Sequence, residues 1–405
     1  MRACFWIALS IVVALPAHGE TPQTLAGAFA AAWERQPVAQ ALGERQRAAE
    51  ARQEAASALT AEPPSLELGG RSDRFNRDRG AEEYEVGLVL PLWLPGERRG
   101  SLALATAEGA ALTARTAALR LQLAGALRQA WWDWQLADNE RQLADERLAA
   151  ARRLRDDVTK RVAAGDLARA DQHQADGELA AATAAQAEAG AQFAAAGYRL
   201  QALTGQAPTA PLAKAEAEVA AGEEATLLAV HPQLLALAGR GDVSRQELAL
   251  ARSRSRANPE ITIATRRERG LAGEAMEQTW ALALRIPFSS GARQQARLAE
   301  ANAELIESRL SAEREGERLV QEVAAARSRL GAARLQLSAA EERARLAGES
   351  REFFAKSFRL GESDLPTRLR IEQEAFAAAS QAARARINLA ASLSAYRQAL
   401  GLLPE

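Results

Sequence analysis

The stretch YEVGLVLPLWLPGERR, Tyr84–Arg99, decides the fold of this chain. Apolar side chains alternate with other residues from Tyr84 to Leu90, a period of two that predicts a β-strand. Pro91 ends this strand, because proline has no N–H to donate to a further sheet bond. Beyond Pro95 the sequence contains no proline as far as Val162. A helix of about 60 residues, roughly 95 Å long, is therefore expected to follow.

A second copy of this pattern occurs in WALALRIPFSSGAR, Trp280–Arg293. Pro287 lies 196 residues after Pro91. Two pairs of glycines have the same separation, Gly165 with Gly361 and Gly205 with Gly401. A fixed period predicts a tandem duplication. Residues 20–205 are the predicted first repeat, 206–225 the linker and 226–405 the second repeat.

Each repeat is predicted to contain short helices, two strands, a long helix and a returning helix. The expected strands are 66–72, 83–92, 259–267 and 278–286. The expected helices are 21–33, 37–60, 98–162, 167–203, 232–258, 292–359 and 365–400. Short turns predict that each long helix and its returning helix lie antiparallel as a hairpin. Leu298, Leu305, Ala312, Leu319 and Ala326 recur at sevens, which predicts a coiled-coil seam.

The N-terminus resembles a secretory signal peptide, with an apolar run from Phe5 to Leu15 and cleavage predicted after Gly19, so that residues 1–19 are removed. Cys4, the one cysteine, lies within it, so disulfides are not expected in the mature chain. The 51 basic and 52 acidic residues are interspersed, which argues against nucleic-acid binding and favours solvated helix faces.

Chemistry-bearing motifs are missing from the sequence. No nucleophile–base pair, phosphate-binding loop or zinc-ligand spacing occurs, so we expect neither an enzyme nor a cofactor. The mature chain offers only His173, His231 and Met276 as soft or imidazole ligands, which predicts no metal site.

The four strands of one chain are too few to close a barrel and need strands from other copies of the chain. An open sheet in a bilayer would leave its edge N–H and C=O groups unpaired. A closed barrel takes about eight or more strands, so a dimer would supply eight and a trimer twelve, of which the larger leaves a useful lumen. The predicted fold is mainly α with a small β part.

The chain resembles the TolC-type outer-membrane efflux channels, nearest to their heavy-metal, CzcC-like branch. The resemblance rests on the duplication and on three segments, PLWLPGER (Pro91–Arg98), RVAAGDL (Arg161–Leu167) and LTG (Leu203–Gly205). It implies a homotrimer in the outer membrane of a Gram-negative bacterium. In this assembly four strands per chain build a shared twelve-stranded transmembrane β-barrel, and the helical hairpins form an α-barrel through the periplasm. It also implies that a periplasmic adaptor and an inner-membrane pump are the partners.

Candidate functional residues cluster at the two hairpin turns. The resemblance implies adaptor docking at these tips, which consist of Gly165, Asp166, Leu167, Gly361, Glu362 and Ser363. Two aspartates that form the family's constriction correspond here to Thr367 and Arg370, so the acidic gate is not retained residue by residue. The candidate constriction is therefore the wider set of Asp364, Thr367, Arg370 and Asp171. For any single charged residue of this set, a solvated helix face is the competing interpretation.

The predicted function is a passive conduit for small solutes or metal ions in a tripartite efflux system. One alternative is a secreted structural coiled coil without a pore, which would have no reason to repeat two proline-bounded strands. Another is the adaptor itself, which would need one hairpin and larger β-domains. The sequence does not determine the exported substrate or the identity of the pump. It also does not determine whether the resting channel is open or closed, or which residues face the lumen.

Overall fold

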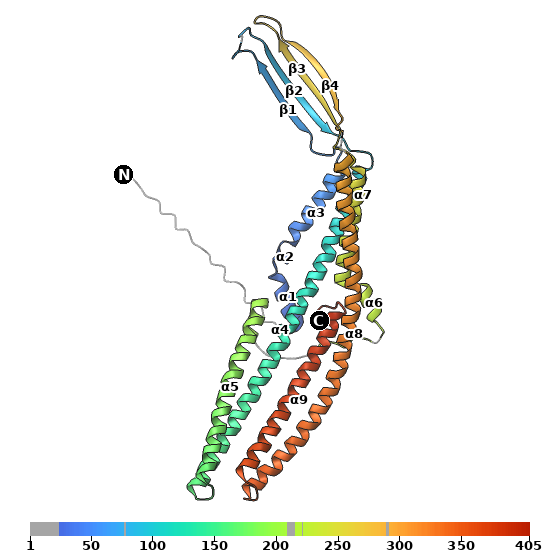
Figure 1. The fold of residues 1–405 in the computed structure, drawn as a ribbon. Helices are drawn as coiled ribbons and strands as arrows, with labels where there is room; N and C mark the ends of the chain where they lie inside the picture. Colours follow the sequence, from blue (N-terminus) through green and yellow to red (C-terminus); the bar gives the residue numbers. More distant parts are fainter. Residues whose placement is uncertain (1–23, 77, 209–214, 221, 289–290) are drawn as a thin grey trace, which may run out of the picture.

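The computed structural model shows an elongated chain with a β-sheet at one end and two helical tips at the other (Figure 1). It describes residues 24–405 apart from 77, 209–214, 221 and 289–290. The predicted signal peptide, 1–19, lies outside the described residues, as does part of the predicted linker.

Both halves of the chain run through short helices, two strands, a long helix and a returning helix. The first half contains α1 (Leu25–Glu34), α2 (Pro37–Gln40), α3 (Leu42–Ser57), β1 (Ser65–Ser72), β2 (Glu82–Pro91), α4 (Glu97–Ala163) and α5 (Arg169–Thr204). The second contains α6 (Glu224–Ala229), α7 (Pro232–Ser253), β3 (Glu260–Arg269), β4 (Glu277–Arg285), α8 (Gly291–Arg359) and α9 (Leu365–Ala399). The predicted fold class, mainly α with four strands and long helical hairpins, is confirmed.

The four strands form one antiparallel sheet in the order β1-β2-β3-β4. The central pairing of β2 with β3 joins the two halves of the chain, with Leu88 opposite Ile263. Leu66 lies opposite Leu88, and Ile263 lies opposite Leu282, so one row crosses all four strands. Only β1 and β4 are edge strands in this sheet.

Alanine-lined seams hold each long helix against its returning helix. In α5 the buried residues Ala175, Ala182, Ala189 and Ala196 recur at sevens and face α4. Small side chains at this spacing let two helices approach closely and supercoil. Of the heptad seam predicted in α8, Leu319 and Ala326 are buried, and the positions nearer the sheet are half-buried.

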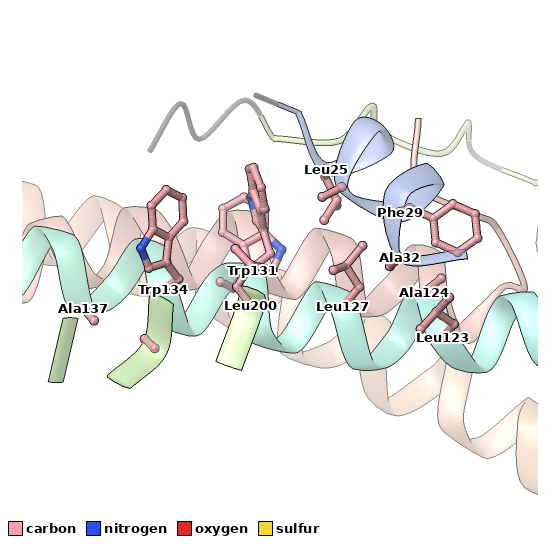
Figure 2. Packing of buried hydrophobic residues seen from close by; sticks show 13 residues of the cluster. Leu25, Phe29, Ala32, Leu123, Ala124, Leu127, Trp131, Trp134, Ala137 and Leu200 are labelled. Atoms are coloured by element: carbon pink, nitrogen blue, oxygen red, sulfur yellow. The ribbon is translucent and has the colours of Figure 1, made fainter. Parts of the chain in front are cut away.

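The largest cluster of buried apolar side chains lies midway along α4 and at the C-terminal end of α5, where α1 covers both helices (Figure 2). Trp131 and Trp134 pack edge-to-face with ring centroids 5.8 Å apart, and Trp134 stacks on Phe193 at 6.1 Å. Trp132 donates a 2.9 Å hydrogen bond from Nε1 to Oγ of Ser394 in α9. These tryptophans therefore pack between helices.

Two predicted helices differ most from the structure. Helix α7 ends at Ser253 rather than residue 258: Arg254 already leaves the helical conformation with ψ 61°, and Asn258 precedes a proline and is disfavoured in the α conformation. The helix predicted over 37–60 is divided into α2 and α3. The short helix α6, at the edge of the predicted linker, was not predicted. Within the described part of the chain, none of the helices has the length and apolar character that crossing a bilayer demands.

Candidate functional site

The sheet has one polar face and one face that is apolar except at its loop end, where Glu82, Arg267 and Arg269 lie. Counting from the Leu66–Leu88–Ile263–Leu282 row, every second residue on each strand shares the first face. The exposed side chains on this face are Leu66, Leu68, Tyr84, Val86, Leu88, Ile263, Trp280, Leu282 and Leu284. Leu282 is 77% exposed and Trp280 is 73% exposed. Such a continuous exposed apolar surface marks contact with a membrane or another protein.

The opposite face of the sheet is small and charged. Arg266 lies 3.1 Å from the carboxylates of both Glu83 and Glu85. Arg285 pairs with Glu260 at 3.6 Å, while Gly87 and Ala264 fill the middle of this face. A sheet that is apolar on one side and polar on the other has the alternation of a membrane-spanning barrel wall.

A buried carboxylate fixes the junction between the sheet and the helices. Gly96 adopts φ 83°, and Glu97 then opens α4. The Glu97 carboxylate is 1% exposed. It accepts hydrogen bonds from Leu94 N–H (3.0 Å), Arg254 Nε (2.7 Å) and Asn258 Nδ2 (2.6 Å). Asn258 also donates to the Leu92 carbonyl at 2.9 Å. This junction ties the end of β2 and the start of α4 to the segment between α7 and β3.

A second buried charge cluster joins the segment after the first repeat to both hairpins. Arg128 of α4 holds Glu216 by two hydrogen bonds of 2.6 and 3.0 Å, and both side chains are under 5% exposed. Arg128 also donates to Gln398 Oε1 at 2.6 Å and to the Leu402 carbonyl at 2.9 Å. Arg397 of α9 donates to the Ala217 carbonyl at 2.9 Å. Because these charges are desolvated, removing one partner would leave the other uncompensated.

The two predicted hairpin tips lie at the same end of the chain (Figure 1), and their backbones share one turn geometry. Gly165 has φ +87° and Gly361 has φ +77°. The following N–H groups bond five residues back, from Asp166 to the Arg161 carbonyl (2.9 Å) and from Glu362 to the Ser357 carbonyl (3.0 Å). This is the Schellman arrangement, in which glycine takes the left-handed position after a helix. Leu167 and Ser363 follow in the turns and are half-buried.

An aromatic side chain locks the two tips together. Phe358 of α8 is 1% exposed and packs with Leu154, Val158 and Leu365. The guanidinium carbons of Arg161 and Arg368 lie 4.8 and 4.7 Å from its ring centroid, and Arg161 also donates to the Phe358 carbonyl at 3.3 Å. Cation–π contact of this kind adds to burial. Nothing in the local sequence predicts this lock, although Arg161 lies within a segment that carries the family resemblance.

Two of the predicted constriction residues, Asp364 and Asp171, cap helices, whereas Arg370 forms an exposed ion pair. Asp364 is the N-cap of α9, where its Oδ1 accepts from Thr367 N–H at 3.0 Å, and hydrogen bonding to Thr367 lowers the pKa of the Asp364 carboxyl. Asp171 accepts from Ala168 N–H at 3.0 Å at the start of α5. Arg370 is exposed and pairs with Glu374 at 2.7 Å. The tip turns thus place one capping acid in each hairpin.

Among the described residues, His, Cys, Asp and Glu side chains do not gather in threes in a way that could hold a metal ion. His231, one of the two histidines outside the predicted signal peptide, is 1% exposed and accepts a 3.2 Å hydrogen bond at Nδ1 from Gln233 N–H. Its ring therefore caps α7.

Comparison with known proteins defines the class of the fold. The chain aligns with a membrane protein from Pseudomonas aeruginosa (TM-score 0.78, 20% identity, 94% of this chain and 91% of that chain). It aligns equally well with CusC (TM-score 0.78, 18% identity, 94% and 92%). The open state of the Neisseria gonorrhoeae MtrE outer membrane channel gives a TM-score of 0.76 at 18% identity, with 94% and 89% covered. The fold is that of outer-membrane channels.

The family comparison agrees with the fold. Residues 34–206 match the family model described as outer membrane efflux protein. The resemblance to TolC-type outer-membrane efflux channels is thus confirmed, whereas the CzcC-like branch is not distinguished from the others. No curated protein gives a match.

Proposed function

We propose that this chain is the outer-membrane channel of a tripartite efflux system, a passive conduit for small solutes or metal ions. The family match over residues 34–206 and the shared fold support an outer-membrane efflux channel with a periplasmic extension. The observation that carries the proposal is the sheet, whose apolar face is exposed across all four strands while its other face is small and charged.

The proposed assembly is a homotrimer. Because β1 and β4 have one free edge each, copies of the sheet can pair side by side and satisfy the edge groups. Three copies give twelve strands, enough to enclose a lumen lined by the charged face. The outer-membrane lipid would then cover the apolar face, and the hairpins would continue the wall as an α-barrel. The two similar halves fit the proposed division into repeats 20–205 and 226–405.

The hairpin tips are the proposed meeting point with a periplasmic adaptor that links an inner-membrane pump. They lie farthest from the sheet and expose Asp166 and Glu362. Asp364, Thr367, Arg370 and Asp171 remain the proposed constriction. Of these, Arg370 is the best probe, because its side chain is exposed and does not cap a helix.

A pair of neighbouring residues tests which face of the sheet meets lipid. Leu282 lies on the apolar face and Ala281 on the other. Arginine on a lipid-facing strand position costs about 2–4 kcal/mol near the bilayer midplane. Leu282→Arg should therefore impair insertion into liposomes and assembly into trimers, while the matched variant Ala281→Arg should insert like the parent. Equal insertion of both variants would refute a membrane-spanning role for the sheet.

A further inference from the structure

Near the hairpin tips, the four long helices of one chain form a row, and the helix at each end of the row has one side without a neighbouring helix among the described residues. Helix α5 packs on α4, α4 packs on α9, and α9 packs on α8. In Figure 1 the tips follow this row from α5 on one side to α8 on the other. A closed ring of copies must therefore place α8 of one copy beside α5 of the next. This contact is heterologous, since its two surfaces differ, and such contacts form a ring when the rotation between copies closes.

The free face of α5 carries an unused heptad stripe. Its residues are spaced alternately by three and four and are all exposed: Gly177, Ala180, Ala184, Ala187, Ala191, Ala194 and Tyr198. At about 100° per residue this stripe lies about 200° round the helix from the alanine seam that faces α4. We call it the α5 stripe.

The free face of α8 carries a matching stripe with large apolar side chains. With the same spacing of three and four it contains Leu335, Ala339, Glu342, Leu346, Glu349, Phe353, Lys356 and Leu360, all exposed. Leu335 is 75% exposed and Phe353 is 72% exposed. This α8 stripe lies about 200° from the buried seam of α8, Ala326, Ala333 and Ala340. Leucine and phenylalanine at heptad positions are knobs that require holes on a facing helix.

Small residues of the α5 stripe and large residues of the α8 stripe lie the same number of residues from their tip glycines. Ala180 lies 15 residues after Gly165, and Leu346 lies 15 residues before Gly361. Ala191 and Leu335 are each 26 residues from the same glycines. Large side chains of α8 thus meet small side chains of α5 when the tips are level, as they are within one protomer (Figure 1).

The helices that carry the two stripes also have net charges of opposite sign near the tips. Over residues 169–198, α5 has four acids and one arginine, whereas residues 335–360 of α8 have five bases and four acids. A repulsive like-charge contact is therefore avoided, and long-range attraction favours this pairing over α5 with α5.

We propose that the α8 stripe of one copy packs into the α5 stripe of the next copy, with Leu346 on Ala180 and Leu335 on Ala191, and that this seam closes the periplasmic ring. The inference rests on the proposed trimer and adds the residues that join the copies. It places the α8 stripe out of solvent in the assembled channel.

Disulfide cross-linking tests the seam, because Cys4 is the only cysteine of the chain. In a Cys4→Ser background, the pairs Ala180→Cys with Leu346→Cys and Ala191→Cys with Leu335→Cys are oxidised in the detergent-purified full chain. A disulfide needs Cα atoms within about 7 Å, so it reports direct contact. The matched control combines Leu346→Cys with Ala181→Cys, an exposed alanine at the same height but about 100° round α5.

We expect covalent dimers and trimers on non-reducing gels for both test pairs, at least tenfold more than for the control. A trimeric mass in detergent without cross-links, or with equal cross-linking of the control, would overturn the seam and leave the channel proposal standing. A monomeric mass would overturn both.

Discussion

Replacing Glu97 by alanine should loosen the junction between the sheet and the helices. The change removes a carboxylate that is 1% exposed and leaves the N–H of buried Leu94 without its acceptor. A buried donor without a partner costs about 1–3 kcal/mol, and a hydrogen bond to a charged group adds about 1.5–3 kcal/mol. Arg254 is 48% exposed and can turn to water, so its loss contributes little. Asn258 still reaches the Leu92 carbonyl. We therefore expect a local loss of roughly 3 kcal/mol.

Hydrogen–deuterium exchange of the purified protein measures this loss at the junction itself. About 1.4 kcal/mol corresponds to a factor of ten, so amides at the start of α4 and the end of α7 should exchange roughly 100-fold faster in Glu97→Ala. Glu108→Ala is the control, since the Glu108 carboxylate of α4 lies 3.8 Å from Arg52 at the surface and should contribute under about 1 kcal/mol. If exchange at the junction is the same in both variants, the assigned role of Glu97 is wrong.

Other predictions concern glycine, histidine and aromatic positions. Gly401→Ala should destabilise by more than about 2 kcal/mol, because a Cβ would lie 2.7 Å from His231 Cδ2 and 2.8 Å from Pro232 Cδ at φ +80°. Gly361→Ala should cost only about 1 kcal/mol, since its Cβ would meet nothing within 4 Å; urea midpoints that rank the two oppositely would contradict this. Burial lowers the pKa of His231 below its ordinary value of 6.5, so the unfolded chain takes up the proton first and stability should fall as the pH drops below about 6.5. His231→Gln should flatten that part of the stability profile, and an unchanged slope would exclude His231 as its source. Phe358→Ala should cost about 3–5 kcal/mol locally and speed protease cleavage at both tips; unchanged cleavage would argue against the lock.

Local patterns were sufficient to predict most of the fold. Proline-bounded alternation located the four strands to within about two residues, and the period of 196 residues paired the hairpin turns. Both signals are contained within a few neighbouring residues, or within a repetition of them. The same is true of Gly165 and Gly361, where a helix must end in a left-handed residue.

The interactions that hold the halves together could not be predicted, because each joins residues far apart in the sequence. Glu97 meets Asn258 across 161 positions, and Arg128 meets Glu216 across 88. Neither carboxylate differs in local sequence from the many solvated acids of this chain. For the same reason, the sequence could not separate the roles of the candidate constriction residues. Only the structure distinguishes Asp364 and Asp171, which cap helices, from Arg370, which projects from the surface.

Single-channel conductance in a planar bilayer, measured together with the oligomeric mass in detergent, tests the central proposal most directly. A trimer that gives discrete conductance steps, with their size altered by Arg370→Glu, is the predicted result. A monomer or dimer that gives no conductance at any voltage, even with Phe358→Ala to release the tips, would contradict the channel and favour a structural coiled coil.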